Sequence, residues 1–464
     1  MKRLFILANF IFFTIALSAE VRLPSILGDG MVLQQKSKTN LWGWATPHKK
    51  ITIVTSWNNK TYTEHSSSDG KWNIKIETPE AGGPYTITIS DGQPIVLSNV
   101  LIGEVWVCAG QSNVQMPVKG FVGQPIMGSC YAIVMASPRD NIRLLTVFRN
   151  ESTNPMEDCQ STSWLETTPA NVKEFSAIAY FFAKYLQKIL QVPIGIICSA
   201  AGGTNIERWM DQNDYLTTYP NKSMDEVKRV HAGKLYNTMI YPLHPFNIKG
   251  IIWYQGESNV LNPHEYKQLF TKMVASWRNK WELGEFPFYY VQIAPYQYSD
   301  KQASPTGAAE LRQAQLEAMT IIPNSGMAVT SDVGDAKHIH PADKANVSKR
   351  LALWVLAKTY NIPGIPYSGP IYKSAEIKGS KVILSFDYTD MGMTTYNQPL
   401  IGFELAGKNG IFYPAKAAFI GKKEKIEVYS DKVTEPVYVQ LGFKNYMPLN
   451  FCLLYTSPSP RDCS

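Results

Sequence analysis

The sequence lacks the features that would place it in several special classes of protein. It contains no long low-complexity stretch, and 45% hydrophobic with 12% aromatic residues is typical of a globular protein. Its 45 basic and 38 acidic residues are scattered, without the clustered Lys/Arg stripe that nucleic-acid binding requires. Beyond the N-terminal region no apolar run reaches transmembrane length. We therefore expect a folded protein with no nucleic-acid partner and no membrane span in its mature form.

Cysteines are few, and their spacing predicts neither a metal site nor a cofactor. None of the six forms a CxxC or another metal-type pair. Cys108 and Cys198 lie in apolar, strand-like runs and are expected to be buried thiols. Cys130 and Cys159 are candidates for a disulfide in an oxidising compartment.

The first nineteen residues have the layout of a secretory signal peptide. A basic start at Lys2 and Arg3 precedes an apolar run over residues 4–17, which is short for a bilayer span. Small residues follow at Ser18 and Ala19. The mature protein is therefore expected to be periplasmic or secreted, with a retained membrane anchor as the alternative.

The remaining chain divides into four segments. Residues 20–99 show short strand patterns separated by turn signals, which suits a small β-sandwich. Over residues 100–362, apolar strand patterns alternate with helical ones, which predicts a parallel sheet covered on both faces. Residues 363–451 return to strands, and this β-rich region is expected to be truncated. Residues 452–464 resemble a translated sequencing adapter and are expected to be non-native.

Unusual polar residues follow the predicted strands of the central segment. In an open parallel sheet, reactive groups gather at the carboxyl ends of the strands. A serine in a tight turn between strand and helix, such as Ser112, projects its hydroxyl into the cleft. Acyl transfer also needs a base and donors for an oxyanion, and His340, Gly203 and Asn259 follow other strands of the same sheet.

Four motifs in this order resemble the blocks of the SGNH hydrolases, and in particular the sialate O-acetylesterase family. They are GEVWVCAGQSN, SAAGGTNIERW, WYQGESN and DVGDAKHIHP. The resemblance covers about residues 20–451. It implies a three-layer α/β/α esterase domain, flanked by a β-sandwich-like N-terminal region and a β-rich C-terminal region.

The resemblance also implies a role for each motif residue. Ser112 attacks the acetyl carbonyl, and the amides of Ser112 and Gly203 with the Asn259 side chain hold the oxyanion. His340 accepts the serine proton and returns it to the departing sugar hydroxyl.

One departure from the family affects the third member of the triad. The family commonly has an aspartate two residues before this histidine, where the chain has His338. Asp335 is the first candidate for orienting His340, and Asp332 is the alternative. The HxH pair formed by His338 and His340 also permits a zinc site, but no further ligand stands at a recognisable spacing.

Further polar residues near the motifs are candidates for substrate binding. Gln111 and Gln255 are expected to position backbone or substrate, and Glu257 to bond within the cleft floor rather than act as a general base. Arg208 offers a planar fork for a sugar or a carboxylate, or else bridges a loop.

The resemblance therefore implies a serine esterase that removes O-acetyl groups from sugars, with O-acetylated sialic acids as the expected substrates. An acetylxylan-type esterase is the alternative within the same chemistry. A non-catalytic carbohydrate-binding protein on an esterase scaffold is the alternative from another class.

Overall fold

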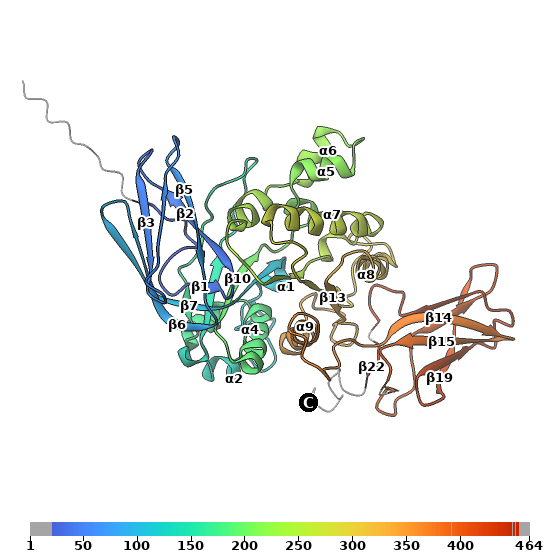
Figure 1. Ribbon diagram of the computed structural model, residues 1–464. Coiled ribbons are helices and arrows are strands. Elements are labelled where there is room, and N and C mark those ends of the chain that lie inside the picture. The colour runs from blue at the N-terminus through green and yellow to red at the C-terminus, as the bar shows by residue number, and fades with distance from the viewer. Residues whose placement is uncertain (1–20, 391, 448, 451, 454–464) are drawn as a thin grey trace, which may run out of the picture.

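The computed structural model describes residues 21–390, 392–447, 449–450 and 452–453 (Figure 1). The expected signal peptide at residues 1–19 lies outside these residues, as does the expected non-native tail from residue 454 onward. The first two residues of that expected tail, which spans 452–464, are described. They form strand β22 (Cys452–Leu453), which pairs with β16 (Met393–Thr394). No helix in the described ranges is long and apolar enough to cross a membrane.

A mostly parallel sheet forms the centre of the molecule. Its parallel strands contain almost only buried residues after position 100, as expected for a sheet covered on both faces. The antiparallel strand β9 closes one edge. In spatial order the strands are β13 (Ser325–Ala328), β12 (Phe288–Val291), β11 (Gly250–Tyr254), β7 (Pro94–Gly110), β10 (Ile194–Ala200), β8 (Ile142–Val147) and β9 (Leu165–Glu166).

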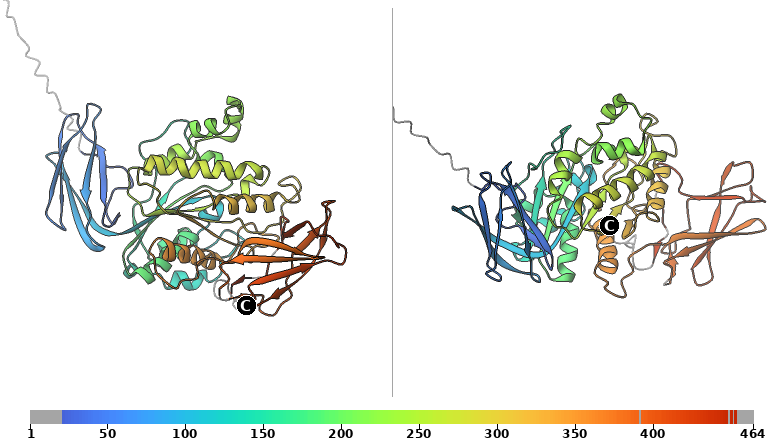
Figure 2. Two further views of the ribbon diagram at one scale, coloured as in Figure 1. Left: turned by 45° about the vertical axis from the view of Figure 1, so that its right-hand side comes forward. Right: turned by 45° about the horizontal axis from the view of Figure 1, so that its top comes forward.

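Helices cover both faces of this sheet. The helices α7 (Pro263–Trp281) and α8 (Gly307–Ala318) lie over one face, and α4 (Ala177–Leu190) and α9 (Lys344–Lys358) over the other (Figures 1 and 2). Their apolar residues pack into two separate cores, one on each face. The predicted three-layer α/β/α architecture is therefore confirmed. The shorter helices are α1 (Ser112–Gln115), α2 (Ser129–Val134), α3 (Pro169–Glu174), α5 (Gln212–Thr218) and α6 (Met224–Val230).

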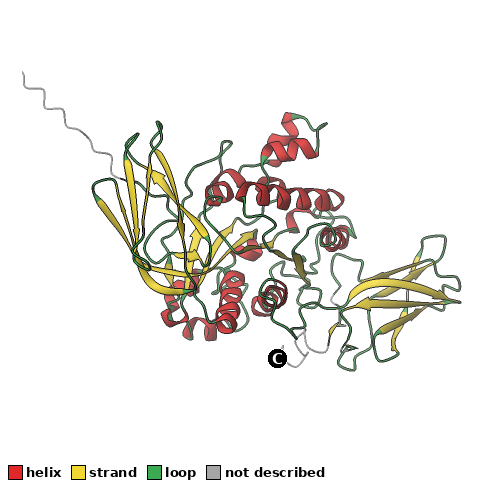
Figure 3. Ribbon diagram, in the orientation of Figure 1, coloured by secondary structure: helices red, strands yellow, loops and turns green. Residues whose placement is uncertain are grey.

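Strands dominate the regions at both ends of the described chain (Figure 3). In the N-terminal region β2 pairs with β5, and β3 pairs with β4 and β6. The C-terminal region has one four-stranded and one three-stranded antiparallel sheet around its own small core. The N-terminal strands are β1 (Val32–Gln34), β2 (Lys38–Trp44), β3 (Lys50–Thr55), β4 (Thr61–His65), β5 (Lys71–Glu77) and β6 (Gly82–Ser90). The C-terminal strands are β14 (Ile371–Lys378), β15 (Lys381–Asp387), β17 (Phe403–Ala406), β18 (Phe412–Pro414), β19 (Lys416–Ile420), β20 (Lys425–Tyr429) and β21 (Tyr438–Leu441).

Strand β7 belongs to both the N-terminal region and the central sheet. Its first part pairs with β6 and β1, up to Gly103. From Glu104 onward it pairs with β10 and β11. A single strand of 17 residues thus runs through the predicted boundary at residue 99 and ends at Gly110, two residues before Ser112.

Candidate active site

The turn that carries Ser112 depends on a glycine at the end of β7. Gly110 has a φ of +145°, and a Cβ there would lie 2.1 Å from the carbonyl oxygen of Tyr254 in the neighbouring strand. Only glycine therefore lets β7 and β11 approach this closely. The chain then turns through Gln111 and starts α1 at Ser112, whose side chain is half-buried at the carboxyl end of the sheet.

His340 reaches the same edge of the sheet from the loop that precedes α9. Its Nε2 lies 2.9 Å from the Ser112 Oγ, within hydrogen-bond distance, although 228 residues separate the two. The structure thus brings together the two residues that the sequence predicts as nucleophile and base. This is the geometry that proton transfer from a serine hydroxyl to an imidazole requires.

The surroundings of His340 favour its neutral form. Burial lowers the pKa of His340 to about 4, and electrostatic repulsion from Lys344 and His338 contributes to the shift. The ordinary pKa of histidine is about 6.5. At neutral pH the ring is therefore unprotonated and able to accept a proton.

The other ring nitrogen of His340 contacts an amide. Its Nδ1 lies 2.7 Å from the Oε1 of Gln124, which belongs to the loop between α1 and α2. The ring of Phe121, from the same loop, packs edge-on against the imidazole with centroids 5.3 Å apart. The sequence analysis did not identify Gln124, because no motif surrounds it.

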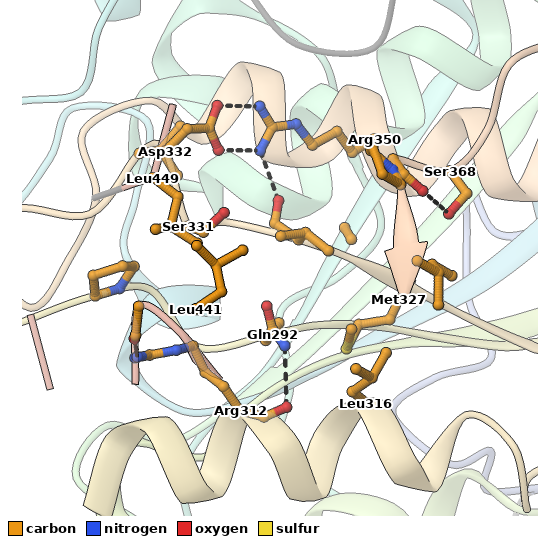
Figure 4. A pocket seen from close by; sticks show the side chains of 18 of the residues that line it. Gln292, Arg312, Leu316, Met327, Ser331, Asp332, Arg350, Ser368, Leu441 and Leu449 are labelled. Atoms are coloured by element: carbon orange, nitrogen blue, oxygen red, sulfur yellow. Dashed lines mark hydrogen bonds and ion pairs between the residues drawn. The ribbon is translucent and has the colours of Figure 1, made fainter. Parts of the chain in front are cut away.

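Neither aspartate expected to orient His340 occupies that position, and the expectation for Asp335 is corrected here. The Asp335 carboxylate accepts hydrogen bonds from the backbone amides of Lys337 and His338 at 2.7 and 2.9 Å, so it stabilises the turn before the histidine. Those bonds hold the pKa of Asp335 below its usual value. Asp332 forms a two-bond ion pair with Arg350, at 2.7 and 2.6 Å (Figure 4).

That ion pair lines a pocket of about 530 Å³ that is distinct from the Ser112–His340 pair. The pocket lies between the central domain and the C-terminal β-rich region, with Arg312 and Leu316 on α8 and Leu441 and Leu449 among its walls (Figure 4). Neither Ser112 nor His340 lines it.

The predicted oxyanion donors surround the Ser112 turn. A Cβ on Gly202 would lie 3.3 Å from the Ser112 Cβ, so the loop after β10 packs against Ser112. The Gly202 amide donates to Gln115 Oε1 at 2.9 Å, whereas no partner for the Gly203 amide is found within the described chain. The Asn259 side chain donates to Glu207 at 3.0 Å, which uses one of its two N–H groups.

Gln111, Gln255 and Glu257 lie beneath the turn rather than in contact with solvent. All three are buried. The Gln255 amide donates to the Thr204 carbonyl at 3.0 Å and to Asn259 Oδ1 at 2.8 Å. The Gln111 amide, oriented to donate, lies 3.3 Å from the Thr204 carbonyl and from Glu257. Their polar groups therefore bond within the protein and support the strand ends, which is the cleft-floor role expected for Glu257. For Gln111 and Gln255 these bonds correspond to the positioning of backbone rather than of substrate.

A buried ionic network that the sequence analysis missed lies next to the Ser112–His340 pair. Asn113 donates to Glu257 and accepts from Lys344, and its side-chain nitrogen lies 3.3 Å from the Ile339 carbonyl oxygen. Burial raises the pKa of Glu257 and lowers that of Lys344 to about 7. Because Asn113 follows Ser112 and Ile339 precedes His340, this network ties the two loops together.

Two arginines meet at one carboxylate on the other side of the turn. Arg149 donates to the Gly202 carbonyl at 3.3 Å and to Glu151 at 2.8 Å. Arg208 donates to the same Glu151 oxygen at 3.0 Å. The predicted Arg208 therefore bridges a loop, and Arg149, which is half exposed, brings a second guanidinium to the Gly202 loop. Two positive charges and one negative charge leave the cluster cationic.

The structure also places the residues that were candidates for metal binding and for a disulfide. Within the ranges that the structure describes, no group of three or more His, Cys, Asp or Glu side chains is arranged to hold a metal ion. Cys108 and Cys198 are buried thiols, as expected. Cys130 is exposed and Cys159 is buried, and both are free.

Comparisons with known proteins point to a family of carbohydrate esterases. The family model for carbohydrate esterases described as sialic acid-specific acetylesterases matches residues 102–357. The sialate O-acetylesterase of Mus musculus is 27% identical over 432 residues, which is 79% of each chain. That of Homo sapiens is 28% identical over 410 residues, covering 79% of this chain and 76% of its own.

A solved structure matches over nearly the whole length. The crystal structure of a carbohydrate acetylesterase from Xanthomonas citri superposes with a TM-score of 0.85 at 33% identity, covering 93% of this chain and 96% of its own. The chain is therefore an esterase for O-acetyl groups on carbohydrates and belongs to the sialic acid-specific acetylesterase family of carbohydrate esterases.

Proposed function

We propose that this protein removes O-acetyl groups from sialic acids through a covalent acyl-enzyme, with Ser112 as nucleophile and His340 as general base. The observation that carries the proposal is the 2.9 Å contact between Ser112 Oγ and His340 Nε2. The sialate O-acetylesterases among its relatives support the choice of substrate.

The reaction follows from the positions of these groups. His340 Nε2 takes the hydroxyl proton as Ser112 Oγ bonds to the acetyl carbon. The carbonyl oxygen becomes an oxyanion, held by the amides of Ser112 and Gly203 and by the free N–H of Asn259. Collapse breaks the ester bond, and His340 returns the proton to the departing sugar oxygen. Water then attacks the acetyl-serine and loses a proton to His340. As the bond between the acetyl carbon and Ser112 Oγ breaks, His340 returns that proton to Oγ, and the released acetic acid ionises to acetate.

The cationic cluster of Arg149, Arg208 and Glu151 favours binding of an acidic sugar over a neutral one. Arg149 lies at the carboxyl end of β8, next to the loop that packs on Ser112. Guanidinium groups bind carboxylates through two parallel hydrogen bonds. A sialic acid carries a carboxylate, whereas the backbone sugars of acetylxylan carry none. We therefore assign Arg149 to the carboxylate of the substrate.

One experiment separates the three candidate functions. Purified wild type and Ser112→Ala are given acetylated sialosides, acetylated xylan oligomers and a chromogenic acetate, and the released acetate is measured. We expect the highest kcat/KM on sialosides and loss of at least about 1000-fold in Ser112→Ala, because nucleophile and base act as a unit. Equal rates from both proteins would leave only a binding function. A preference for xylan oligomers would support the acetylxylan alternative.

The Arg149 assignment is tested in the same assay. Charge-assisted hydrogen bonds contribute about 1.5–3 kcal/mol. We therefore expect Arg149→Ala to lower kcat/KM on sialosides, relative to kcat/KM on the chromogenic acetate, by about 10- to 100-fold. Arg139→Ala is the matched control, because this exposed arginine precedes β8 at the opposite edge of the sheet. An unchanged ratio in Arg149→Ala contradicts the assignment.

We further propose that the protein works in the periplasm or outside the cell. The support is the signal-peptide pattern of residues 1–19. N-terminal sequencing after expression in a secreting host checks this, and an unprocessed Met1 on cytoplasmic material contradicts it.

A further inference from the structure

We infer that Gln124 is the positioning residue of the active site, and that its uncharged amide takes the place of a triad carboxylate at His340. The inference rests on the proposed function, because it assigns His340 the role of general base. It adds a residue that lies in none of the four motifs.

The loop that carries Gln124 is fixed to the active site. Phe121 and Gln124 exchange two backbone hydrogen bonds, of 3.1 and 3.0 Å, which close a tight hairpin. Farther along, the Met127 amide donates to the Ala342 carbonyl at 3.1 Å, two residues after His340. The Gln124 amide is therefore held in place beside the imidazole before any substrate binds.

The contact selects the tautomer that catalysis requires. An amide oxygen only accepts hydrogen bonds, so the Gln124 Oε1 at 2.7 Å fixes the ring proton on Nδ1. The lone pair of the neutral ring is then on Nε2, which faces the Ser112 hydroxyl. The edge-on Phe121 ring restricts rotation of the imidazole about its long axis.

The missing charge has a consequence for His340. The titratable groups that act on its pKa in the described chain are Lys344 and His338, and both oppose protonation of the ring. A carboxylate at Nδ1 would stabilise the imidazolium that forms during the reaction, whereas an amide fixes only its orientation. Replacing Gln124 by glutamate should therefore supply a charge that the wild-type site lacks.

The test compares Gln124→Leu, Gln124→Glu and Asp335→Asn with wild type, measuring kcat and its pH profile on a chromogenic acetate. Gln124→Leu removes the acceptor and should lower kcat by about 10- to 100-fold, because a misoriented base loses part of its contribution. Gln124→Glu should keep kcat at pH 7 at or above wild type and raise the midpoint of the acid limb by at least about one pH unit. Asp335→Asn keeps the turn's acceptor oxygen and should change neither quantity.

The outcomes separate this inference from the proposed function. Ser112→Ala is measured alongside, and its full activity would end the proposed function itself. If Ser112→Ala is inactive while Gln124→Leu matches wild type in kcat and pH profile, Gln124 has no positioning role. Loss of activity in Asp335→Asn alone would return that role to the aspartate. The thermal midpoint of each variant is recorded, and if Gln124→Leu does not fold, the pH shift of Gln124→Glu decides.

Discussion

At the scale of single residues, protonation of His340 sets the acid limit of the proposed reaction. An ordinary histidine would lose half its activity near pH 6.5. Because burial and repulsion from Lys344 and His338 lower its pKa to about 4, we expect kcat/KM on a chromogenic acetate to stay nearly constant from pH 8 to 5. It should fall to half near pH 4. A midpoint near 6.5 in the measured profile would contradict this environment for the ring.

The lowered pKa of His340 also reduces the stability of the folded protein in acid. The unfolded chain takes up the histidine proton near pH 6.5, whereas the folded chain takes it up near pH 4. The contribution of His340 to the free energy of unfolding is therefore complete above pH 6.5 and decreases as the pH falls to about 4. Circular dichroism at each pH distinguishes loss of the fold from protonation of the base.

The residues of the site divide into those with a sequence signal and those without one. Ser112 and His340 follow predicted strands inside recognisable motifs, so their convergence could be predicted. Gln124 lies 216 positions from His340 in an irregular loop, and only the folded loop brings it to Nδ1. Asp335 was the first candidate for orienting His340 because it lies only five residues before it. In the structure its carboxylate instead accepts hydrogen bonds from the backbone amides of its own turn.

At the scale of secondary-structure elements, the period of the hydrophobic pattern predicted the central domain well. Within residues 100–362, apolar residues recur at three- and four-residue steps over positions 343–358 and 176–190, and these segments form α9 and α4, with Ser176 as the cap of α4. Buried parallel strands and amphipathic helices have strong signals, because burial on one or both faces dictates their residues. Pairing partners have no such signal, so the extension of β7 across two regions was not foreseen.

The junction of β7 and β11 gives a prediction at this scale. Gly110→Ala places a Cβ 2.1 Å from the Tyr254 carbonyl oxygen and also strains a positive φ. Overpacking and backbone strain each cost about 1–3 kcal/mol, so we expect a loss of about 2–6 kcal/mol in the free energy of unfolding. Chemical denaturation measures this loss.

Gly92→Ala is the control for backbone strain alone. Gly92 has a φ of +122°, and nothing lies within 4 Å of its added Cβ. The difference between the two variants therefore reports the steric contact with Tyr254. Equal stabilities for both would show that β7 and β11 separate without cost.

At the scale of the whole molecule, a buried arginine connects the central domain to the C-terminal β-rich region. Arg312 on α8 donates to the carbonyl oxygens of Lys444, Asn445 and Gly442, at 2.5, 3.4 and 3.4 Å. Asn445 in turn accepts from the Ala308 amide at 2.9 Å. These bonds place the segment around residues 442–445 on α8, next to the pocket in Figure 4.

Removing this arginine should destabilise the protein. Arg312→Ala leaves the Lys444 carbonyl without a donor, whereas the Gly442 and Asn445 carbonyls keep the backbone amides of Lys444 and Tyr296. An unsatisfied buried carbonyl costs about 1–3 kcal/mol, so we expect a loss of about that size, measured as a lower thermal midpoint. Arg229→Ala, which breaks an exposed ion pair with Glu226, should change stability by less than about 1 kcal/mol. A similar midpoint for both variants would show that the two regions do not depend on Arg312.

The course of β7 limits how this protein can be rearranged by recombination or by engineering. A crossover at residue 99, where the sequence pattern changes, would cut a hydrogen-bonded strand that ends two residues before Ser112. The N-terminal region therefore cannot be exchanged as an independent unit. A graft of a foreign carbohydrate-binding module must retain β7 whole, together with the β6 and β1 backbones that flank its first half.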